Sequence, residues 1–459
     1  MFTLNKEAIN QAMYKKNIKT YTELSERLLL NNTQLSNMLN TEYSPIKNNV
    51  LLLMKELDLS FSEIINIKNK NVKEVFESSS SEKFEQLDLK FDNLDFSIAD
   101  YISENKKYQL NNYEDFSLFS SENYFNVIET FAGAGGLSLG LEKANLKTQV
   151  AIELDKYAAE TLKKNTQNTL IIQDDINNVL KKGFESYGIE KNNIDILSGG
   201  YPCQSFSYAG KRNGLADVRG TLFKSYAETL SEIKPKVFIA ENVKGLITHD
   251  KGKTLYTMIK IFEKEGYEIY WNLFNSWDYD VAQKRHRIFI VGIRKDLIKK
   301  EKYPFKFPSP TGNKPLLKDV IKDVPYSPGV KYSEKKEKVM KLVPPGGCWV
   351  DLPDSIAREY MGASYYSGGG KRGMARRLSW EEPSLTLTTS PNQKQTERCH
   401  PDETRPLTIN EYSRIQGFPD SWKFVGSIGN QYKQIGNAVP VNLAKYIGLA
   451  VNKYLKQFE

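Results

Sequence analysis

The alternation of short apolar runs with segments of helix length most constrains the fold of this chain. Between Tyr124 and Ile293 the apolar runs are FNVIETF, QVAIEL, NTLIIQ, IDILSG, KVFIAENV and RIFIVGI. Strands separated by helix-length segments are typical of a parallel sheet, because parallel neighbours need long crossover connections. We therefore expect an α/β domain over residues 124–299.

The length of 459 residues exceeds what one hydrophobic core usually organises, so we expect further domains. The alternation stops after Ile293, and a basic, Pro- and Gly-punctuated region follows, which we assign to a small irregular domain over residues 300–400. Apolar pattern returns in residues 401–459. There QIGNAVPVNLAKYIGLAVNKYL is predicted to form a helix that closes the α/β domain.

The N-terminal residues 1–75 are predicted to form a small all-α domain. Short helices are indicated by LNKEAINQAMYKK, YTELSERL, NTQLSNMLN and IKNNVLLLMKELDL. The NTQLSNMLN segment resembles the second helix in helix-turn-helix domains of phage-repressor-like regulators, and a helical bundle used for packing or dimerisation is the alternative. The serine run ESSSSEK at Glu77–Lys83 marks a boundary, so residues 76–123 are predicted to be a linker.

Composition limits where the protein works and what it binds. We find no apolar run approaching the roughly 20 residues of a membrane span, and no signal peptide, so we expect a cytoplasmic protein. The three cysteines have no C-x-x-C spacing, so no metal site is predicted. The net charge is +8, and residues 294–341 alone hold 14 Lys and Arg against 6 Asp and Glu. This excess fits either a polyanionic partner or a solvated lysine-rich surface.

A glycine-rich loop after the first predicted strand indicates a nucleoside cofactor. The loop is Ala132-Gly133-Ala134-Gly135-Gly136, and it departs from strict G-x-G-x-x-G because Ser138 takes the last glycine position. The next strand ends at Glu153, where a carboxylate can accept hydrogen bonds from ribose hydroxyls. A third strand ends near Asp174-Asp175-Ile176, which suits an adenine amino group. Because no phosphate-binding Lys follows the loop, the cofactor is expected to lack phosphates.

Three further segments carry groups suited to catalysis. Cys203 follows Pro202 just beyond the strand IDILSGG, where α/β sheets place their ligands. Glu241-Asn242-Val243 ends another strand, and Gln283-Lys284-Arg285-His286-Arg287 precedes the strand IFIVGI. A single cysteine is commonly a buried apolar residue, and a single charge commonly a surface pair. Together they favour an active site.

The ordered motifs resemble those of bacterial DNA cytosine-5 methyltransferases. The matching segments are ETFAGAGGLSLG, GGYPCQSFSYAGKRNGLADVRGTLF, ENVKGL, QKRHRIFIVG, RPLTINEYSRIQGFP and QYKQIGNAVPVNLA. They cover Val127 to about Gly292 and Arg405 to Leu455. The resemblance implies a Rossmann-like S-adenosylmethionine-dependent fold with a mixed sheet of mainly parallel type. It also implies double-stranded DNA as substrate, residues 300–400 as target-recognition domain, action as a monomer on DNA, and a restriction–modification system.

The resemblance also implies roles for individual residues. Cys203 would be the nucleophile, and Glu241, Arg285 and Arg287 would hold the target base. His286 stands at a variable position and is given no role. Residues 204–220 would form a mobile loop that closes over DNA. The cofactor would contact Phe131, Gly133, Gly135, Gly136, Leu137, Glu153, Leu154, Asp175, Ile176, Pro202, Leu222, Asn437 and Val439.

The chemistry explains why these groups are needed together. Carbon 5 of cytosine is too electron-poor to accept a methyl group directly, so the Cys203 thiolate must first add to carbon 6. Glu241 can donate a proton to ring nitrogen 3 and stabilise the enamine that develops. Access to the ring face requires the base to be flipped out of the duplex.

The target-recognition region has its own expected contacts. Gly368-Gly369-Gly370-Lys371-Arg372 and Arg376-Arg377 are predicted to approach DNA closely, and Ser384–Thr388 resembles a Thr-Leu element found in such domains. Cys348 and Cys399 are expected to be structural. Two alternatives remain open: a tRNA cytosine methyltransferase with the same Pro-Cys and Glu-Asn-Val groups, and a transcriptional regulator. We also expect residues 1–75 to bind the operator DNA upstream of the chain's own gene.

Overall fold

The computed structural model describes most of the chain in two compact units. The described residues are 2–18, 20–28, 35, 39, 56–57, 65–67, 98–116, 118–201, 222–366 and 373–459. Contacts divide the chain into Met1–Asp95 and Phe96–Glu459. Each unit is described by itself.

The N-terminal unit contains two of the predicted helices, α1 (Lys6–Lys15) and α2 (Tyr21–Arg27). Asn5 and Thr20 cap them, because each side-chain oxygen accepts a backbone hydrogen bond, at 3.2 Å and 3.1 Å. The unit is not all-α as predicted. Strand β1 (Phe2–Leu4) pairs antiparallel with β2 (Ile65–Ile67), two short segments rich in strand-favouring residues. The predicted helix NTQLSNMLN lies outside the described residues, apart from Leu35 and Leu39.

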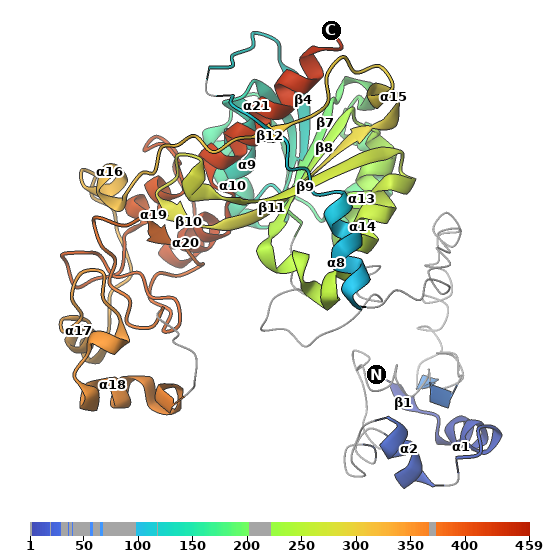
Figure 1. Ribbon diagram of the computed structural model, residues 1–459, viewed down its shortest axis with the longest axis horizontal. Coiled ribbons are helices and arrows are strands. Elements are labelled where there is room, and N and C mark those ends of the chain that lie inside the picture. The colour runs from blue at the N-terminus through green and yellow to red at the C-terminus, as the bar shows by residue number, and fades with distance from the viewer. Residues whose placement is uncertain are drawn as a thin grey trace. The chain divides into compact units, whose positions relative to one another are not determined.

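The second unit is built on a seven-stranded mixed sheet with the order β6-β5-β4-β7-β8-β11-β9 (Figure 1). The strands are β4 (Phe125–Thr130), β5 (Leu146–Ile152), β6 (Leu170–Ile172), β7 (Ile196–Gly199), β8 (Val237–Val243), β9 (Tyr267–Asn275) and β11 (His286–Arg294). All six predicted strands are present. The first five are parallel, whereas β11 runs antiparallel to both of its neighbours.

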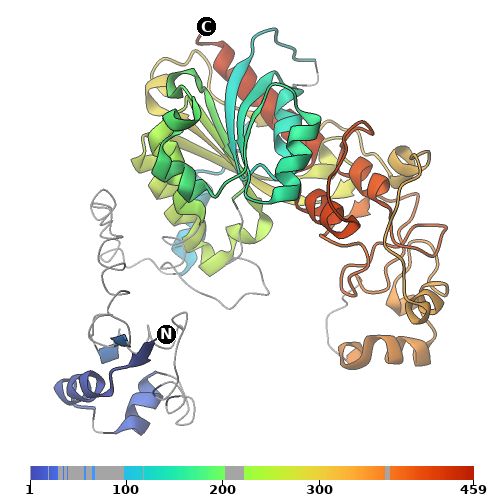
Figure 2. The same ribbon diagram turned by 180° about the vertical axis from the view of Figure 1, so that it is seen from behind.

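Helices cover both faces of this sheet (Figures 1 and 2). They are α8 (Ile98–Lys107), α9 (Gly136–Glu142), α10 (Lys156–Asn165), α11 (Ile176–Lys182), α13 (Leu222–Ile233), α14 (Lys253–Lys264), α15 (Lys295–Ile298) and α21 (Val441–Lys456). Consecutive residues of β4 point to opposite faces of the sheet and so into different cores, as in any β-strand. Ile128 joins the core with α11, α13 and α14, and Val127 joins the core with α9 and α21. The predicted closing helix is present as α21, but it starts later than predicted, because Gln434–Asn437 end α20 and Pro440 precedes α21.

The segment predicted as a linker contributes structure to this unit from residue 98 onward. Helix α8 contacts α14, and strand β3 (Tyr113–Glu114) pairs parallel with β12 (Phe307–Pro308). Residues 98–116 therefore pack against the sheet, for example through hydrogen bonds from Trp271 and Asn272 of β9, and are not a simple linker.

The remaining elements form a lobe beside the sheet, in which α17 and α18 lie farthest from it (Figure 1). These elements are β10 (Gln283–Lys284), β13 (Ser384–Leu385), α16 (Leu317–Ile321), α17 (Glu334–Met340), α18 (Asp354–Met361), α19 (Ile409–Ile415) and α20 (Ile428–Asn437). Cys348 and Cys399 are buried free cysteines, consistent with a structural role. Residues 368–372 lie outside the described residues.

Arg377 corrects one expectation about this lobe. Its side chain is buried, and its guanidinium donates to the carbonyl oxygens of Met340 and Val343, both at 2.7 Å, and to His400 O at 3.2 Å. A guanidinium enclosed by carbonyls cannot approach DNA. Arg377 therefore holds the lobe together, whereas its neighbour Arg376 pairs with Glu382 at 3.0 Å.

Among the described residues, every helix is too short or too polar to span a membrane. No group of three or more His, Cys, Asp or Glu side chains among them is placed to hold a metal ion.

Candidate active site

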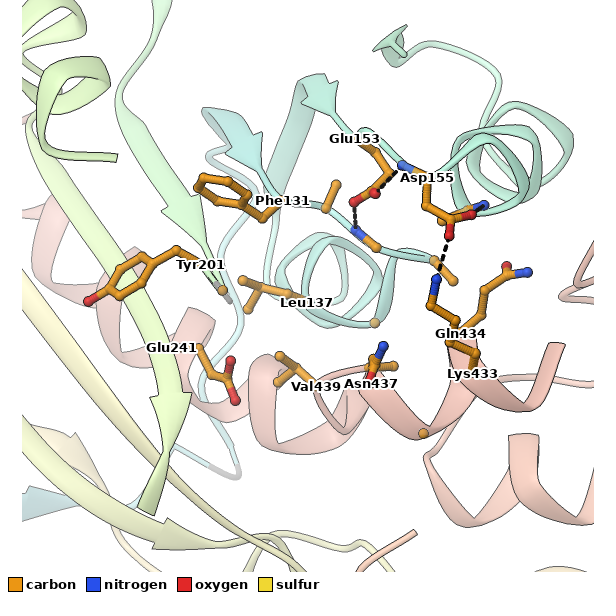
Figure 3. A pocket seen from close by; sticks show the side chains of 18 of the residues that line it. Phe131, Leu137, Glu153, Asp155, Tyr201, Glu241, Lys433, Gln434, Asn437 and Val439 are labelled. Carbon is orange, nitrogen blue, oxygen red and sulfur yellow. Dashed lines mark hydrogen bonds and ion pairs between the residues drawn. The ribbon is translucent and has the colours of Figure 1, made fainter. Parts of the chain in front are cut away.

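A cavity of about 1410 Å³ lies at the carboxyl ends of the parallel strands. Cofactor and substrate sites for one small molecule usually measure roughly 300–1,000 Å³, so this cavity has room for a cofactor and part of a second molecule. Many of the predicted site residues line it (Figure 3). The predicted residues along its wall are Phe131, Gly133, Gly136, Leu137, Glu153, Leu154, Asp175, Ile176, Leu222, Glu241, Arg285, Arg287, Asn437 and Val439.

The glycine-rich loop turns sharply between β4 and α9. Phe131, Gly133 and Gly135 have positive φ angles of 56°, 56° and 90°. A Cβ atom on Gly136 would lie 2.4 Å from the carbonyl oxygen of Val439. Only glycine at this position therefore allows the start of α9 to lie so close to the Val439 backbone. The loop and the segment before α21 thus form one wall of the cavity. Phe131 is a non-glycine residue in a strained conformation, which is common at binding sites.

Glu153 stands at the end of β5 with its carboxylate fixed from two sides. Gly133 N donates to Oε2 and Asp155 N to Oε1, each at 2.7 Å (Figure 3). Burial nevertheless raises the pKa of this carboxyl, against the effect of the two hydrogen bonds. Each oxygen keeps a second lone pair for a ligand hydroxyl. The next residue, Leu154, is 65% exposed and lines the cavity, where its side chain could pack against a flat ring.

The third predicted cofactor contact is also at the cavity. Asp175 caps α11 by accepting from Asn177 N at 2.8 Å, and Ile176, the first residue of the helix, is buried. Asp174 turns to Lys182, 3.2 Å away. Leu222, the first residue of α13, also lines the cavity, and α13 contacts α11.

Glu241 and Arg287 form a buried ion pair on adjacent strands. In the antiparallel register of β8 and β11, Val243 lies opposite Arg287, so Glu241 and Arg287 share one face. Arg287 Nε lies 2.7 Å from Glu241 Oε1. Burial raises the pKa of Glu241, and the two nearby arginines oppose this. A Cβ on Gly200 would lie 2.9 Å from Glu241 Oε2, so the absent side chain leaves that oxygen open to the end of β7.

Arg285 lines the same cavity but its guanidinium is occupied. The side chain is 1% exposed and donates to Leu387 O and Gly436 O, each at 2.9 Å. It therefore joins three segments of the chain, while its Nε–H group has no hydrogen-bond partner among the described residues.

Pro202 and Cys203 lie outside the described residues, as do residues 204–220. The preceding residue is fixed: Asn242 Nδ2 donates to Tyr201 O at 3.3 Å, and Val243 N donates to Asn242 Oδ1 at 2.9 Å. The backbone that leads to Cys203 is thus tied to the strand that carries Glu241.

Several lining residues were not predicted from the sequence. Asp155 pairs with Lys433 at 2.8 Å across the cavity (Figure 3). Thr388, Gln393 and Thr396 line the side toward the lobe. The aspartate could have been found from its position, because Asp before a helical segment is a typical N-cap. Nothing in the local sequence distinguishes Lys433 from a surface lysine.

Comparison with known proteins adds to this geometry. A family model described as C-5 cytosine-specific DNA methylase matches residues 125–453. Type II methyltransferase M.Sau96I of Staphylococcus aureus is 57% identical over 455 residues, which cover 99% of each chain. Type II methyltransferase M.Eco47II of Escherichia coli is 49% identical over 364 residues, which cover 75% of this chain and 85% of the relative.

Solved structures are similar in fold. One described as a DNA modification methyltransferase encoded within an E. coli prophage has a TM-score of 0.52 at 26% identity, and the match covers 72% of this chain and 99% of that one. A DNMT2 variant of Spodoptera frugiperda has a TM-score of 0.50 at 16% identity, over 73% of this chain and 100% of that one, which supports the fold alone. The predicted Rossmann-like arrangement is confirmed.

Proposed function

Because the chain belongs to the C-5 cytosine-specific DNA methylase family, as a bacterial type II methyltransferase that uses S-adenosylmethionine, we propose that it methylates a flipped cytosine through a covalent adduct with Cys203. The observation that carries this proposal is the Glu241–Arg287 pair. This pair faces a cavity that the glycine-rich loop also lines, at the strand ends from which the chain leads to Cys203.

The residues of the cavity fit the cofactor. The glycine loop allows close approach, the Glu153 oxygens can accept from ribose hydroxyls, and the exposed Leu154 side chain can pack on adenine. When bound, S-adenosylmethionine supplies an electrophilic methyl group on a sulfonium. Asp175, Asn437 and Val439 would complete its site.

Cys203 and Glu241 would act on the cytosine ring together. The Cys203 thiolate forms a bond to carbon 6 while the Glu241 carboxyl donates a proton or hydrogen bond to ring nitrogen 3. The raised pKa of Glu241 favours the protonated form that this step needs. Carbon 5 would then bear the methyl group that the cofactor supplies. A solvent water takes the carbon 5 proton, the electron pair of that C–H bond re-forms the 5,6 double bond, and Cys203 leaves carbon 6 as the thiolate. Ring nitrogen 3 returns its proton to Glu241. Arg287 would keep the Glu241 carboxyl in position.

We expect residues 300–400, the predicted target-recognition domain, to bind the DNA around the flipped base, and the protein to act on DNA as a monomer. Thr386, Thr388 and Gln393 line the cavity from this side, where a nucleotide leaving the duplex would enter. Flipping costs a few kcal/mol of stacking and pairing, which contacts in the cavity must offset.

Trapping and sequencing test this proposal. Bisulfite sequencing of DNA from a host expressing the chain should reveal one short methylated site. Duplexes carrying that site with 5-fluorocytosine should form a stable adduct, because fluorine cannot leave carbon 5 as a proton does. Cys203→Ala should form no adduct and no product while still binding S-adenosylhomocysteine. Methylation confined to tRNA, or full activity of Cys203→Ala, would refute the proposal.

The N-terminal unit carries a second proposal, that residues 1–75 bind the operator upstream of the chain's own gene. Two capped helices followed by the NTQLSNMLN segment support it. A footprint on the upstream DNA should be lost when these residues are deleted. A footprint that persists after the deletion would contradict it.

A further inference from the structure

A buried polar bridge links the cofactor side of the cavity to the side that faces DNA. Leu387 lies on the DNA-facing side between Thr386 and Thr388, and residues 436–439 lie on the cofactor side. The segments are far apart in sequence. Both polar groups of the Leu387 backbone are connected to residues 435–438, the carbonyl directly through Arg285 and the N–H group through Gln283 and Gln416.

The first connection starts from the Leu387 N–H group. It donates to Gln283 Oε1 at 2.9 Å, and Gln283 Nε2 donates to Gln416 Oε1 at 2.6 Å. Gln416 Nε2 then donates to Ile435 O at 2.7 Å and Ala438 O at 3.0 Å. Gln283 and Gln416 are both 0% exposed, so water does not compete for these bonds.

The second connection starts from the Leu387 carbonyl. Arg285 donates to it and to Gly436 O, each at 2.9 Å. Gly436 lies in the last turn of α20, where free carbonyls and the helix dipole favour a cation. The backbones also touch: a Cβ on Gly436 would lie 2.2 Å from Thr388 O.

We propose that Gln283, Gln416 and Arg285 are positioning residues that couple cofactor binding to the placement of the Thr386–Thr388 segment against DNA. This inference rests on the proposed function. A ligand that fixes Asn437 and Val439 also fixes the carbonyls on either side of Asn437, and both connections carry that restraint to Leu387. By linkage, DNA held by the segment raises cofactor affinity by the same factor.

Hydrogen exchange of the full chain with S-adenosylhomocysteine, without DNA, tests the coupling. In the wild type the Leu387 amide should exchange more slowly when the ligand is bound. Gln283→Met keeps the size of the side chain but loses its hydrogen bonds to Leu387 and Gln416. This variant should still bind the ligand, but the ligand should no longer slow exchange of the Leu387 amide. Gln431→Met is the matched control on α20, because it loses one side-chain bond, to Gly426 O, outside the bridge. It should behave as the wild type.

Affinity for a short duplex carrying the methylated site gives the second readout. S-adenosylhomocysteine should tighten wild-type DNA binding roughly tenfold, within the usual range of allosteric coupling, and should tighten binding by Gln283→Met much less. The coupling is refuted if the ligand binds the wild type without slowing exchange of the Leu387 amide. It is also refuted if a folded Gln283→Met shows the same increase in DNA affinity as the wild type. In both cases the proposed function stands. If the ligand does not bind the wild type, both are refuted. Should Gln283→Met fail to fold, the wild-type exchange experiment still decides.

Discussion

Three carboxyl groups border the same cavity, and each has different partners. Glu153 accepts two backbone hydrogen bonds, Glu241 pairs with Arg287, and Glu129 has an oxygen, Oε2, with no hydrogen-bond partner. Burial raises the pKa of all three, to about 8 for Glu129. Desolvation therefore acts on all three carboxyl groups, and their hydrogen-bond partners and neighbouring charges oppose it to different degrees.

Replacement of Glu241 separates its chemical role from its structural one. Glu241→Gln keeps the shape of the side chain but cannot donate a carboxyl proton to ring nitrogen 3. We expect kcat to fall by roughly 10²–10⁴, the usual range for loss of a general acid, with little change in affinity for S-adenosylhomocysteine. Single-turnover methylation and calorimetric titration measure the two effects. A variant with wild-type kcat would exclude Glu241 from the chemistry.

Glu129 should make the unfolding free energy depend on pH. Its pKa is about 8 in the folded chain against an ordinary value of 4.5, so between these pH values the folded state keeps a proton that the unfolded state loses. Stability should therefore fall as pH rises through this window, by at most about 1.4 kcal/mol per pH unit. Glu129→Gln removes the titrating group and should flatten this slope. Urea unfolding at several pH values checks it, and an identical slope in both proteins would contradict the assignment.

At the scale of elements, α9 and α21 meet through residues without large side chains. A Cβ on Gly140 would lie 2.4 Å from both Ala444 Cβ and Val441 O, and one on Gly448 would lie 2.8 Å from Ala144 Cβ. This contact sets the distance between the glycine loop before α9 and Val439 before α21. The close packing of α9 on α21 at Gly140 and Gly448 therefore also affects the position of the glycine-rich loop at the cofactor site.

Gly140→Ala tests this contact. We expect it to lower the unfolding free energy by about 1–3 kcal/mol, as overpacking of a core usually does, and to weaken cofactor binding. Gly429→Ala on α20 is the matched control, because its Cβ would have one neighbour, Ser427 Oγ, at 4.0 Å. That substitution should be neutral or stabilise the helix by up to about 1 kcal/mol. Equal effects of the two substitutions would show that helix propensity, not packing, dominates.

The elements also show what the sequence could predict. Runs of apolar residues revealed six strands, among them the short edge strand β6. Strand β9, at the other edge, was missed because its buried residues alternate with Glu268, Tyr270 and other half-buried residues. Arg377 was assigned to DNA because an arginine's sequence neighbours do not reveal six carbonyl and hydroxyl partners from distant segments. The site residues were predicted from the family resemblance. The hydrogen bonds through Gln283 could not be predicted, because they join segments that are far apart in the sequence.

At the scale of the molecule, the compact unit begins before the family domain does. The family model starts at residue 125, whereas the unit begins at Phe96. The residues between them cover the edge strand β9: Leu110 N donates to Trp271 O at 3.1 Å, and Trp271 Nε1 donates to Asn105 O at 2.7 Å. Asn105 Nδ2 also donates to Gly252 O at 2.8 Å, near the end of the segment that follows Glu241-Asn242-Val243.

Two deletions distinguish a linker from a structural part of the catalytic unit. A chain that starts at Phe96 should keep the thermal stability and methylation rate of this unit, because it retains these contacts. A chain that starts at Tyr124 would leave the Trp271 indole and the edge of β9 without their partners. Each unpaired buried group costs about 1–3 kcal/mol, so we expect the midpoint of thermal unfolding to fall by several degrees and the exposed edge to promote aggregation. Calorimetry and size-exclusion chromatography measure these changes. If both chains are equally stable and monomeric, residues 96–123 contribute nothing to the unit, and its boundary coincides with that of the family domain.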